Sequence, residues 1–200
     1  MTRTEFKRLI RANFDPILIP HGFSCEGSKR CVYWRKVSDE IYHIISPDAL
    51  RALDRYDINV YATSPLIEEG FFDKFPDWVP YTNGDFGYLS PERGVGDYQK
   101  LYFCGNPDAF MTSFKRDTAP ALLNIAIPYL DKLQTVEDLI PTIRPSGMMG
   151  AALLHVGRAA EAKHYIESEI RRLSALPRDK LGQVERGLAF QQGLLAKLAI

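Results

Sequence analysis

The stretch Tyr56-Asp57-Ile58-Asn59-Val60-Tyr61-Ala62-Thr63 decides the fold class of this chain of 200 residues. Apolar side chains recur in it at every second position, which places Tyr56, Ile58 and Val60 on one face. Alternation with period two is typical of a strand that is buried on one side and reached by solvent on the other. The sequence therefore predicts a half-buried β-strand over residues 56–63.

Three further segments have the composition of strands. Residues 31–37 and 40–46 are rich in β-branched and aromatic side chains, and the turn-forming pair Ser38-Asp39 separates them. We expect these two segments to form a hairpin. Residues 99–104 offer a fourth strand, so the front part of the chain should hold an antiparallel sheet of about four strands.

Helical patterns stand on both sides of these strands. Apolar residues recur at three- and four-residue steps from Phe6 to Ile17, which predicts a helix that is capped by Thr4 and runs to about Leu18. Gly22 is the expected left-handed stop after that helix.

A second helical region should begin at Asn106, which a proline follows. Pro120 and Pro128 are expected to break or kink it, because proline lacks the backbone donor. The pair Thr135 and Asp138 resembles a helix cap and predicts a short helix over residues 136–140.

From residue 147 onward the sequence has helical periodicity and no strand signal. The expected helices cover residues 148–156, 159–173 and 179–198. The segment 150–162 resembles a single tetratricopeptide-type helical hairpin with Gly157 at its turn, although solenoids of that type need about three repeats.

Together these patterns predict an α+β fold. Its first domain, residues 1–140, should hold the N-terminal helix, the antiparallel sheet and a long aromatic insert. An all-helical C-terminal tail should follow over residues 146–200. Pro141 and Pro145 mark the expected boundary between the two.

The charge balance makes a nucleic-acid partner a poor expectation. The chain has 25 basic and 25 acidic residues and an isoelectric point near 6.9, whereas nucleic-acid-binding proteins usually carry a basic excess. Residues 1–36 do hold eight bases against three acids. Binding of nucleic acid through that part of the chain is the lowest-ranked function.

Cysteine content and hydropathy indicate the compartment. Three cysteines are odd in number and too few for a disulfide framework, and no apolar signal-peptide core follows Met1. The uncharged stretch 118–130 is shorter than the roughly 20 residues of a membrane helix and contains two prolines. We expect a cytoplasmic protein without a membrane partner.

No established catalytic or metal-binding spacing is present. The chain lacks a phosphate-binding P-loop, a complete dinucleotide glycine fingerprint, a serine-hydrolase elbow and the zinc motif HExxH. The spacing of Cys25 and Cys31 fits no common zinc site, and we interpret both as packing or connecting residues. Glu161 and His164 have the spacing of di-iron proteins but no second copy. The sequence therefore predicts no metal and no cofactor.

An acid–base constellation can be drawn around His43. This histidine shares a strand face with Ile41 and Ile45, where a hydrogen-bonded core histidine is commoner than a catalytic one. If its strand neighbours 56–63, Asp57 or Tyr61 could approach the imidazole. The candidate catalytic residues are therefore His43, Asp57 and Tyr61, and the structural interpretation of His43 stays open.

Residues 64–97 form a segment that folding alone does not readily explain. They contain four prolines, five glycines and seven aromatic residues, with seven acids against two bases. Loops of this length are usually binding loops or lids, and the aromatic content argues against disorder. The rings either fasten the segment to the sheet or bind a basic partner together with the carboxylates. The candidate contact residues are Phe71, Phe72, Asp73, Phe75, Asp77, Trp78 and Tyr81.

The run from Phe14 to Leu18 leads into the corner His21-Gly22-Phe23, and aromatic strands and the stretch 56–61 follow. In these features about the first 130 residues resemble a bacterial family of uncharacterised domains, domain of unknown function 4304. The resemblance implies a cytoplasmic bacterial α+β domain and brings no catalytic residues. Analogy with small bacterial domains that neutralise toxins adds an immunity-type role as a hypothesis.

Two functions follow as expectations. The first is a non-enzymatic binding protein, with residues 64–97 as its contact surface and an unidentified, basic protein as its partner. The alternative is a small hydrolase-like enzyme with a site between the sheet and that segment. In the alternative, Asp57, His43 or a carboxylate of the segment acts as general acid or base.

Overall fold

The computed structural model describes residues 1–26, 31–49, 54–68, 87–88, 102–143, 148–176 and 181–198. Over these residues the chain has the predicted α+β fold and divides into two compact units. The first unit takes residues 1–26, 31–49, 54–62, 87–88 and 102–134, and the second takes the other described residues. The division follows Gln134, whereas the sequence places a boundary near Pro141 and Pro145.

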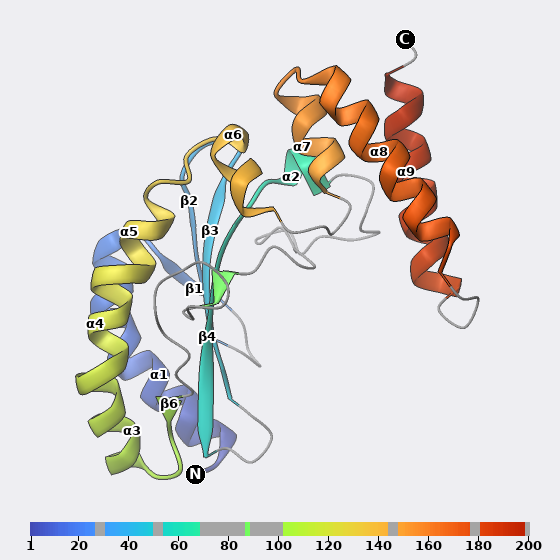
Figure 1. Cartoon of the computed structure of the whole chain (residues 1–200). Coiled ribbons are helices and arrows are strands. Elements are labelled where there is room, and N and C mark those ends of the chain that lie inside the picture. Colours follow the sequence, from blue (N-terminus) through green and yellow to red (C-terminus); the bar gives the residue numbers. More distant parts are fainter. Residues whose placement is uncertain are drawn as a thin grey trace. The chain divides into compact units, whose positions relative to one another are not determined.

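A sheet forms the centre of the first unit (Figure 1). Within the described residues its strands are β1 (Ser24–Glu26), β2 (Val32–Lys36), β3 (Tyr42–Ala49), β4 (Arg55–Thr63), β5 (Gly87–Tyr88) and β6 (Tyr102–Phe103). Their order is β1-β2-β3-β4-β5, and β6 also pairs with β4. The predicted antiparallel hairpin of β2 and β3 is confirmed, with Arg35 opposite His43. The sequence patterns predict β2, β3, β4 and β6 but not the short strands β1 and β5.

The N-terminal helix α1 (Arg3–Leu18) begins earlier than its predicted cap. Thr2 Oγ1 accepts a hydrogen bond from the Glu5 amide at 3.2 Å, and the Glu5 carboxylate accepts one from the Thr2 amide at 2.8 Å. The prediction that Thr4 caps this helix is therefore wrong. Only Thr2 has a glutamate three residues later, which completes the reciprocal capping box.

The end of α1 turns the chain into the sheet. A short 3₁₀ helix, η1 (Ile19–His21), follows α1 and ends at Gly22. The φ angle of Gly22 is 83°, so the predicted left-handed stop is confirmed. The chain then extends directly into β1.

Among the described residues, six aromatic rings attach the helices to one face of the sheet; we call them the aromatic layer. They are Phe6, Phe14, Tyr33, Tyr56, Phe110 and Phe114. Phe14 of α1 stacks on Tyr33 of β2 with 5.9 Å between ring centroids, and Phe110 stacks on Tyr56 of β4 at 5.6 Å. The Tyr56 hydroxyl also lies 2.7 Å from Thr118 Oγ1 in the buried interface. Helices from both ends of this unit therefore cover the same side of the sheet (Figure 1).

The second helical region of this unit stays helical through both of its internal prolines. Its segments are α3 (Pro107–Ser113), η3 (Phe114–Thr118), α4 (Ala119–Ala121), η4 (Leu122–Ala126) and α5 (Ile127–Leu130), of which η3 and η4 are π-helical turns. Asn106 caps its start as predicted, because its side chain accepts from the Ala109 amide at 2.8 Å. The expected breaks do not occur at Pro120 and Pro128. Each proline ring crowds the carbonyl four residues earlier, and that carbonyl lies in a widened π turn.

The second unit has only helical secondary structure among its described residues, apart from Thr63 at the end of β4. Its helices are α2 (Pro65–Glu68), α6 (Val136–Leu139), η5 (Ile140–Thr142), α7 (Met149–His155), α8 (Ala159–Ser174) and α9 (Leu181–Lys197). The predicted cap of α6 is confirmed: Thr135 Oγ1 accepts from the Asp138 amide at 3.3 Å, and the Asp138 carboxylate accepts from the Thr135 amide at 2.9 Å. Among the helices of the described residues, none combines the length and the apolar character that crossing a membrane requires.

Helices α7 and α8 form a hairpin in which the backbone of α7 lies close to a side chain of α8. The turn is at Gly157, whose φ angle is 78°. Gly150 of α7 faces Ile166 of α8 so closely that a Cβ atom on Gly150 would lie 2.6 Å from Ile166 Cγ1. Real Cβ atoms essentially never approach so near, so the small residue at position 150 sets the spacing of the two helices.

This close approach predicts opposite effects of the same substitution at two glycines. Gly150→Ala should lower the free energy of unfolding by about 1–3 kcal/mol, because the added methyl group overpacks the α7–α8 contact. Gly193→Ala in α9 should raise it by up to about 1 kcal/mol through helix propensity, since its methyl group would meet no other described part of the chain within 4 Å. Urea unfolding followed by circular dichroism measures both. Equal shifts in the two variants would contradict the close approach.

Candidate functional site

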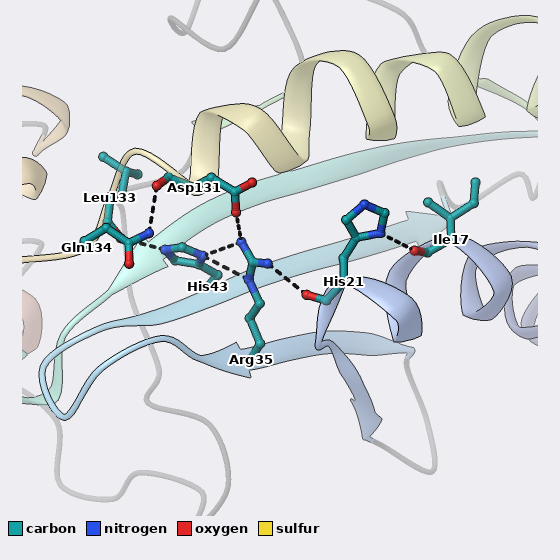
Figure 2. Close-up of polar contacts among 7 residues, drawn as sticks. All are labelled: Ile17, His21, Arg35, His43, Asp131, Leu133 and Gln134. Atoms are coloured by element: carbon teal, nitrogen blue, oxygen red, sulfur yellow. Dashed lines mark hydrogen bonds and ion pairs between the residues drawn. The ribbon is translucent and has the colours of Figure 1, made fainter.

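A charged side chain on the helix-covered face of β2 organises the polar contacts of the first unit (Figure 2). Arg35 is two residues from Tyr33 and therefore points to the same face as the aromatic layer. Only 15% of its side chain is exposed, and its guanidinium carbon lies 4.6 Å from the centre of the Phe23 ring. A buried cation is costly without acceptors, so its hydrogen-bond partners decide the local structure.

The guanidinium of Arg35 donates to three different segments. One terminal nitrogen, Nη1, donates to the His21 carbonyl at 2.8 Å. Nε lies 3.2 Å and Nη2 3.1 Å from His43 Nδ1, across the β2–β3 pairing. Nη2 also forms an ion pair with the carboxylate of Asp131, which directly follows α5. We call Arg35, His43 and Asp131, with the carbonyls of His21 and Leu133, the Arg35 cluster.

His43 is fully buried, and both of its ring nitrogens are engaged. Nε2 lies 2.7 Å from the Leu133 carbonyl, which can only accept, so Nε2 carries the proton. Nδ1 faces the guanidinium of Arg35, which can only donate, so Nδ1 is unprotonated. Burial lowers the pKa of His43 to about 4, and the positive charge of Arg35 acts in the same direction. The histidine is therefore a neutral connector between two strands and the segment after α5.

Asp57 and Tyr61 lie on the other face of the sheet. Tyr56 contacts the aromatic layer, so the alternation of β4 turns its neighbour Asp57 away from the helices and away from His43. Tyr61 shares the face of Asp57 for the same reason. The structure thus does not bring His43 together with either residue, because the period of a strand separates odd and even positions.

Polar residues of β3 and β4 surround Asp57 on that second face. Asn59 Nδ2 donates to Asp48 Oδ2 at 3.1 Å, and Ser46 Oγ donates to the same oxygen at 3.4 Å. Burial, followed by the negative charge of Asp48, raises the pKa of Asp57 above its usual range. Its Oδ1 atom is buried and has no hydrogen-bond partner among the described residues. Asp57 is therefore a carboxyl group that binds its proton more tightly than an ordinary aspartate does.

The other predicted site residues lie outside the described part of the chain. This applies to the candidate contact residues Phe71, Phe72, Asp73, Phe75, Asp77, Trp78 and Tyr81. Of the segment 64–97, the structure describes residues 64–68 and 87–88, which include α2 and β5. Across the described ranges, no group of three or more histidine, cysteine or acidic side chains is arranged to hold a metal ion.

The sequence patterns did not indicate the polar residues that define the two faces of the sheet. Arg35 occupies an odd position of a strand whose other odd position is the buried Tyr33, and a cation in that pattern is a signal that acceptors lie close to the charge. Its partner Asp131 is 96 positions away, so no local pattern could have indicated it. Ser46 is the last residue of the predicted strand 40–46, and Asp48 lies beyond its end. Asp48 comes to lie beside β4 because β3 extends to Ala49.

In comparisons with known proteins, no protein-family model, no curated protein and no solved structure matches the chain.

The state of His43 predicts a pH dependence of stability. Its pKa is about 4 in the folded protein against 6.5 ordinarily, so between these values the unfolded chain binds more protons. The contribution of His43 to the free energy of unfolding is therefore fully present above pH 6.5. It falls by about 3 kcal/mol as the pH is lowered to 4. His43→Gln should be less stable at pH 7 and should lose that part of the pH dependence. Urea unfolding at a series of pH values measures the difference.

A matched control separates the cluster from histidines in general. His164→Gln removes an exposed imidazole of α8 and should leave the pH dependence of the first unit as it is in the wild type. The same slope in wild type and His43→Gln between pH 4 and 6.5 would show that His43 is not buried in its neutral form.

Proposed function

We propose that this protein is a non-enzymatic binding protein whose partner is a basic protein. The observation that carries the proposal is the engagement of His43 in the Arg35 cluster. An imidazole with both nitrogens bonded and a pKa near 4 is unsuited to act as a general base at neutral pH. The acid–base constellation drawn from the sequence is also divided between two faces of the sheet. Folding alone does not explain the segment 64–97, whose acidic and aromatic composition is typical of binding surfaces.

The chemistry of the partner follows from the segment 64–97. Seven acids against two bases favour a positively charged partner through electrostatic steering, and aromatic side chains supply contact area at low entropy cost. The resemblance of the first 130 residues to a bacterial domain family supports a bacterial, cytoplasmic setting. Within that setting, an immunity-type protein that neutralises a basic toxin agrees with the proposed binding role.

Two aromatic residues of the segment provide the test. The double variant Phe75→Ala/Trp78→Ala should lose its partners in a pull-down from bacterial lysate, and its affinity for each partner identified should fall by about tenfold or more, as for interface hot spots. The matched control Ile19→Ala/Leu123→Ala removes two apolar side chains that are 51% and 44% exposed in the first unit. The control should retain the partners, and retention should weaken as salt is raised.

The proposal fails in either of two cases. A folded Phe75→Ala/Trp78→Ala variant with the wild-type set of partners would show that the segment is not the contact. Equal loss in the two double variants would show that capture depends on exposed apolar area in general. Circular dichroism of both variants establishes that each is folded before the comparison is made.

A small hydrolase-like enzyme is the second candidate, and Asp57 is the observation that favours it. A carboxyl group with a raised pKa, a buried oxygen and a second carboxyl nearby is a pattern found at acid–base sites. The proposed site would use Asp57 as general base, with Asp48 tuning its proton affinity and Asn59 holding Asp48 in place.

Hydrolysis of chromogenic esters, phosphomonoesters and glycosides separates the two functions. The binding role predicts no turnover that depends on Asp57. The hydrolase predicts turnover that Asp57→Asn lowers by about 10²–10⁴-fold, as expected for a general base. It further predicts that Asp48→Asn moves the activity profile to lower pH, because the charge that raises the pKa of Asp57 is removed. Turnover that is identical in wild type and Asp57→Asn would exclude this site.

A further inference from the structure

Two cysteines lie side by side on the helix-covered face of the β1–β2 hairpin. Cys25 of β1 is opposite Tyr33 of β2, and Cys31 precedes Tyr33 by two residues. Residues two apart on a strand share a face, so Cys25 and Cys31 are diagonal neighbours across the pairing. The two thiols are close enough to share a hydrogen bond. Their spacing in the sequence gives no sign of this proximity, which arises only when β1 pairs with β2.

Cationic side chains of α1 face this pair. Lys7 and Arg11 are four residues apart and therefore lie on one side of the helix. Arg11 Nη1 donates to the Cys25 carbonyl at 3.4 Å, and Arg11 Nε donates to Asp15 at 2.8 Å. The charge of Arg11 acts on Cys25 and that of Lys7 acts on Cys31. Positive charge beside a thiol stabilises its thiolate, which is the reactive form.

The two thiols differ in ionisation. The hydrogen bond from Cys31, helped by Arg11, lowers the pKa of Cys25 to about 6. The same hydrogen bond and burial raise the pKa of Cys31, which stays protonated. A thiolate that is partly exposed, next to a protonated thiol, is the arrangement of a nucleophilic and a resolving cysteine.

A cavity adjoins the buried member of the pair. Cys31 lines a cavity of about 330 Å³, together with Arg3, Lys7 and Asp48. The volume is ample for a peroxide or a small thiol, and Arg3 and Lys7 add positive charge to the wall. Cys25 itself is partly exposed at the edge strand of the sheet.

We propose that Cys25 and Cys31 form a redox-active pair that a peroxide converts to a disulfide across the β1–β2 hairpin. The Cys25 thiolate attacks one peroxide oxygen, so that an S–O bond forms, the O–O bond breaks and the other oxygen leaves as an alcohol or water after taking a proton. The Cys31 thiol then attacks the sulfur of the Cys25 sulfenic acid. An S–S bond forms, the S–O bond breaks, and water leaves with the proton of Cys31. Two thiols are oxidised and one peroxide is reduced. Two molecules of a small thiol then reduce the disulfide back to two cysteines and are themselves oxidised to a small disulfide.

Cys104 is an internal standard within the same unit. It is fully buried, and burial followed by the charge of Asp54 raises its pKa to about 11. Low exposure and a protonated thiol make it inert toward peroxides and alkylating agents. Selective reaction at Cys25 is therefore measurable inside one wild-type chain, without any variant.

Peptide mapping tests the disulfide directly. Lys29 and Arg30 lie between the two cysteines, so trypsin places Cys25 and Cys31 on separate peptides. After stoichiometric hydrogen peroxide, the full chain should lose the mass of two hydrogen atoms. The non-reduced digest should contain residues 12–29 joined to residues 31–35, and dithiothreitol should separate them. A digest in which both peptides stay free, or in which Cys104 is oxidised first, would overturn the proposal.

Variants and pH profiles identify the role of each cysteine. Cys31→Ser should stop at a Cys25 sulfenic acid that dimedone traps, Cys25→Ser should give no product with peroxide, and Cys104→Ser should behave as wild type. Alkylation of wild-type Cys25 by iodoacetamide should have its midpoint near pH 6. Arg11→Gln should move that midpoint upward, and Arg11→Lys should restore most of it. A midpoint equal to that of an ordinary thiol would contradict the nucleophilic role, even if a variant fails to fold.

Discussion

The positive charge of Arg35 on the helix-covered face of β2 is the constraint on which the first unit depends. A guanidinium has five donors and no way to lose its charge, so the segments around it must present acceptors. The carbonyl of His21, the imidazole of His43 and the carboxylate of Asp131 do so. These three groups belong to the corner after α1, to β3 and to the residues after α5. One charge that is largely shielded from solvent therefore fixes the relative positions of elements that are distant in the sequence.

The same constraint decides what the two faces of the sheet can do. On the helix-covered side the aromatic layer is apolar, and the Arg35 cluster within it is saturated with hydrogen bonds, which makes His43 a structural residue. On the other side Asp57 keeps a buried oxygen without a partner among the described residues, and its raised pKa results from burial and Asp48. Of these two side chains, His43 has both ring nitrogens engaged, and only Asp57 keeps an atom without a partner among the described residues.

Local sequence patterns predict most of the helices and the longer strands but not the contacts between them. The alternation of residues 56–63 predicts β4, and Gly22, Asn106 and Thr135 mark helix ends correctly, because these signals depend on neighbours within a few positions. The error at Thr4 arose because two threonines compete and only Thr2 has a glutamate at the right distance. The helix does not break at Pro120 or Pro128 because a π-helical turn before each proline makes room for its ring. Whether such a turn forms depends on packing and not on the local sequence. The pairing of Arg35 with Asp131 spans 96 positions and has no local signature.

The placement of Cys25 and Cys31 follows from the same distinction between core and edge. β1 has three residues and lies at one end of the strand order, where β2 is its only partner among the described strands. An edge strand can change its covalent state without disturbing the layers behind it, whereas a change at Arg35 would leave the buried imidazole of His43 without its donor. The anchored end of the hairpin, where Arg35 holds the corner at His21, keeps β1 in register with β2. The Arg35 cluster thereby holds the two thiols close together. Their reactivity depends on the hydrogen bond between Arg35 and the His21 carbonyl, to which neither cysteine contributes.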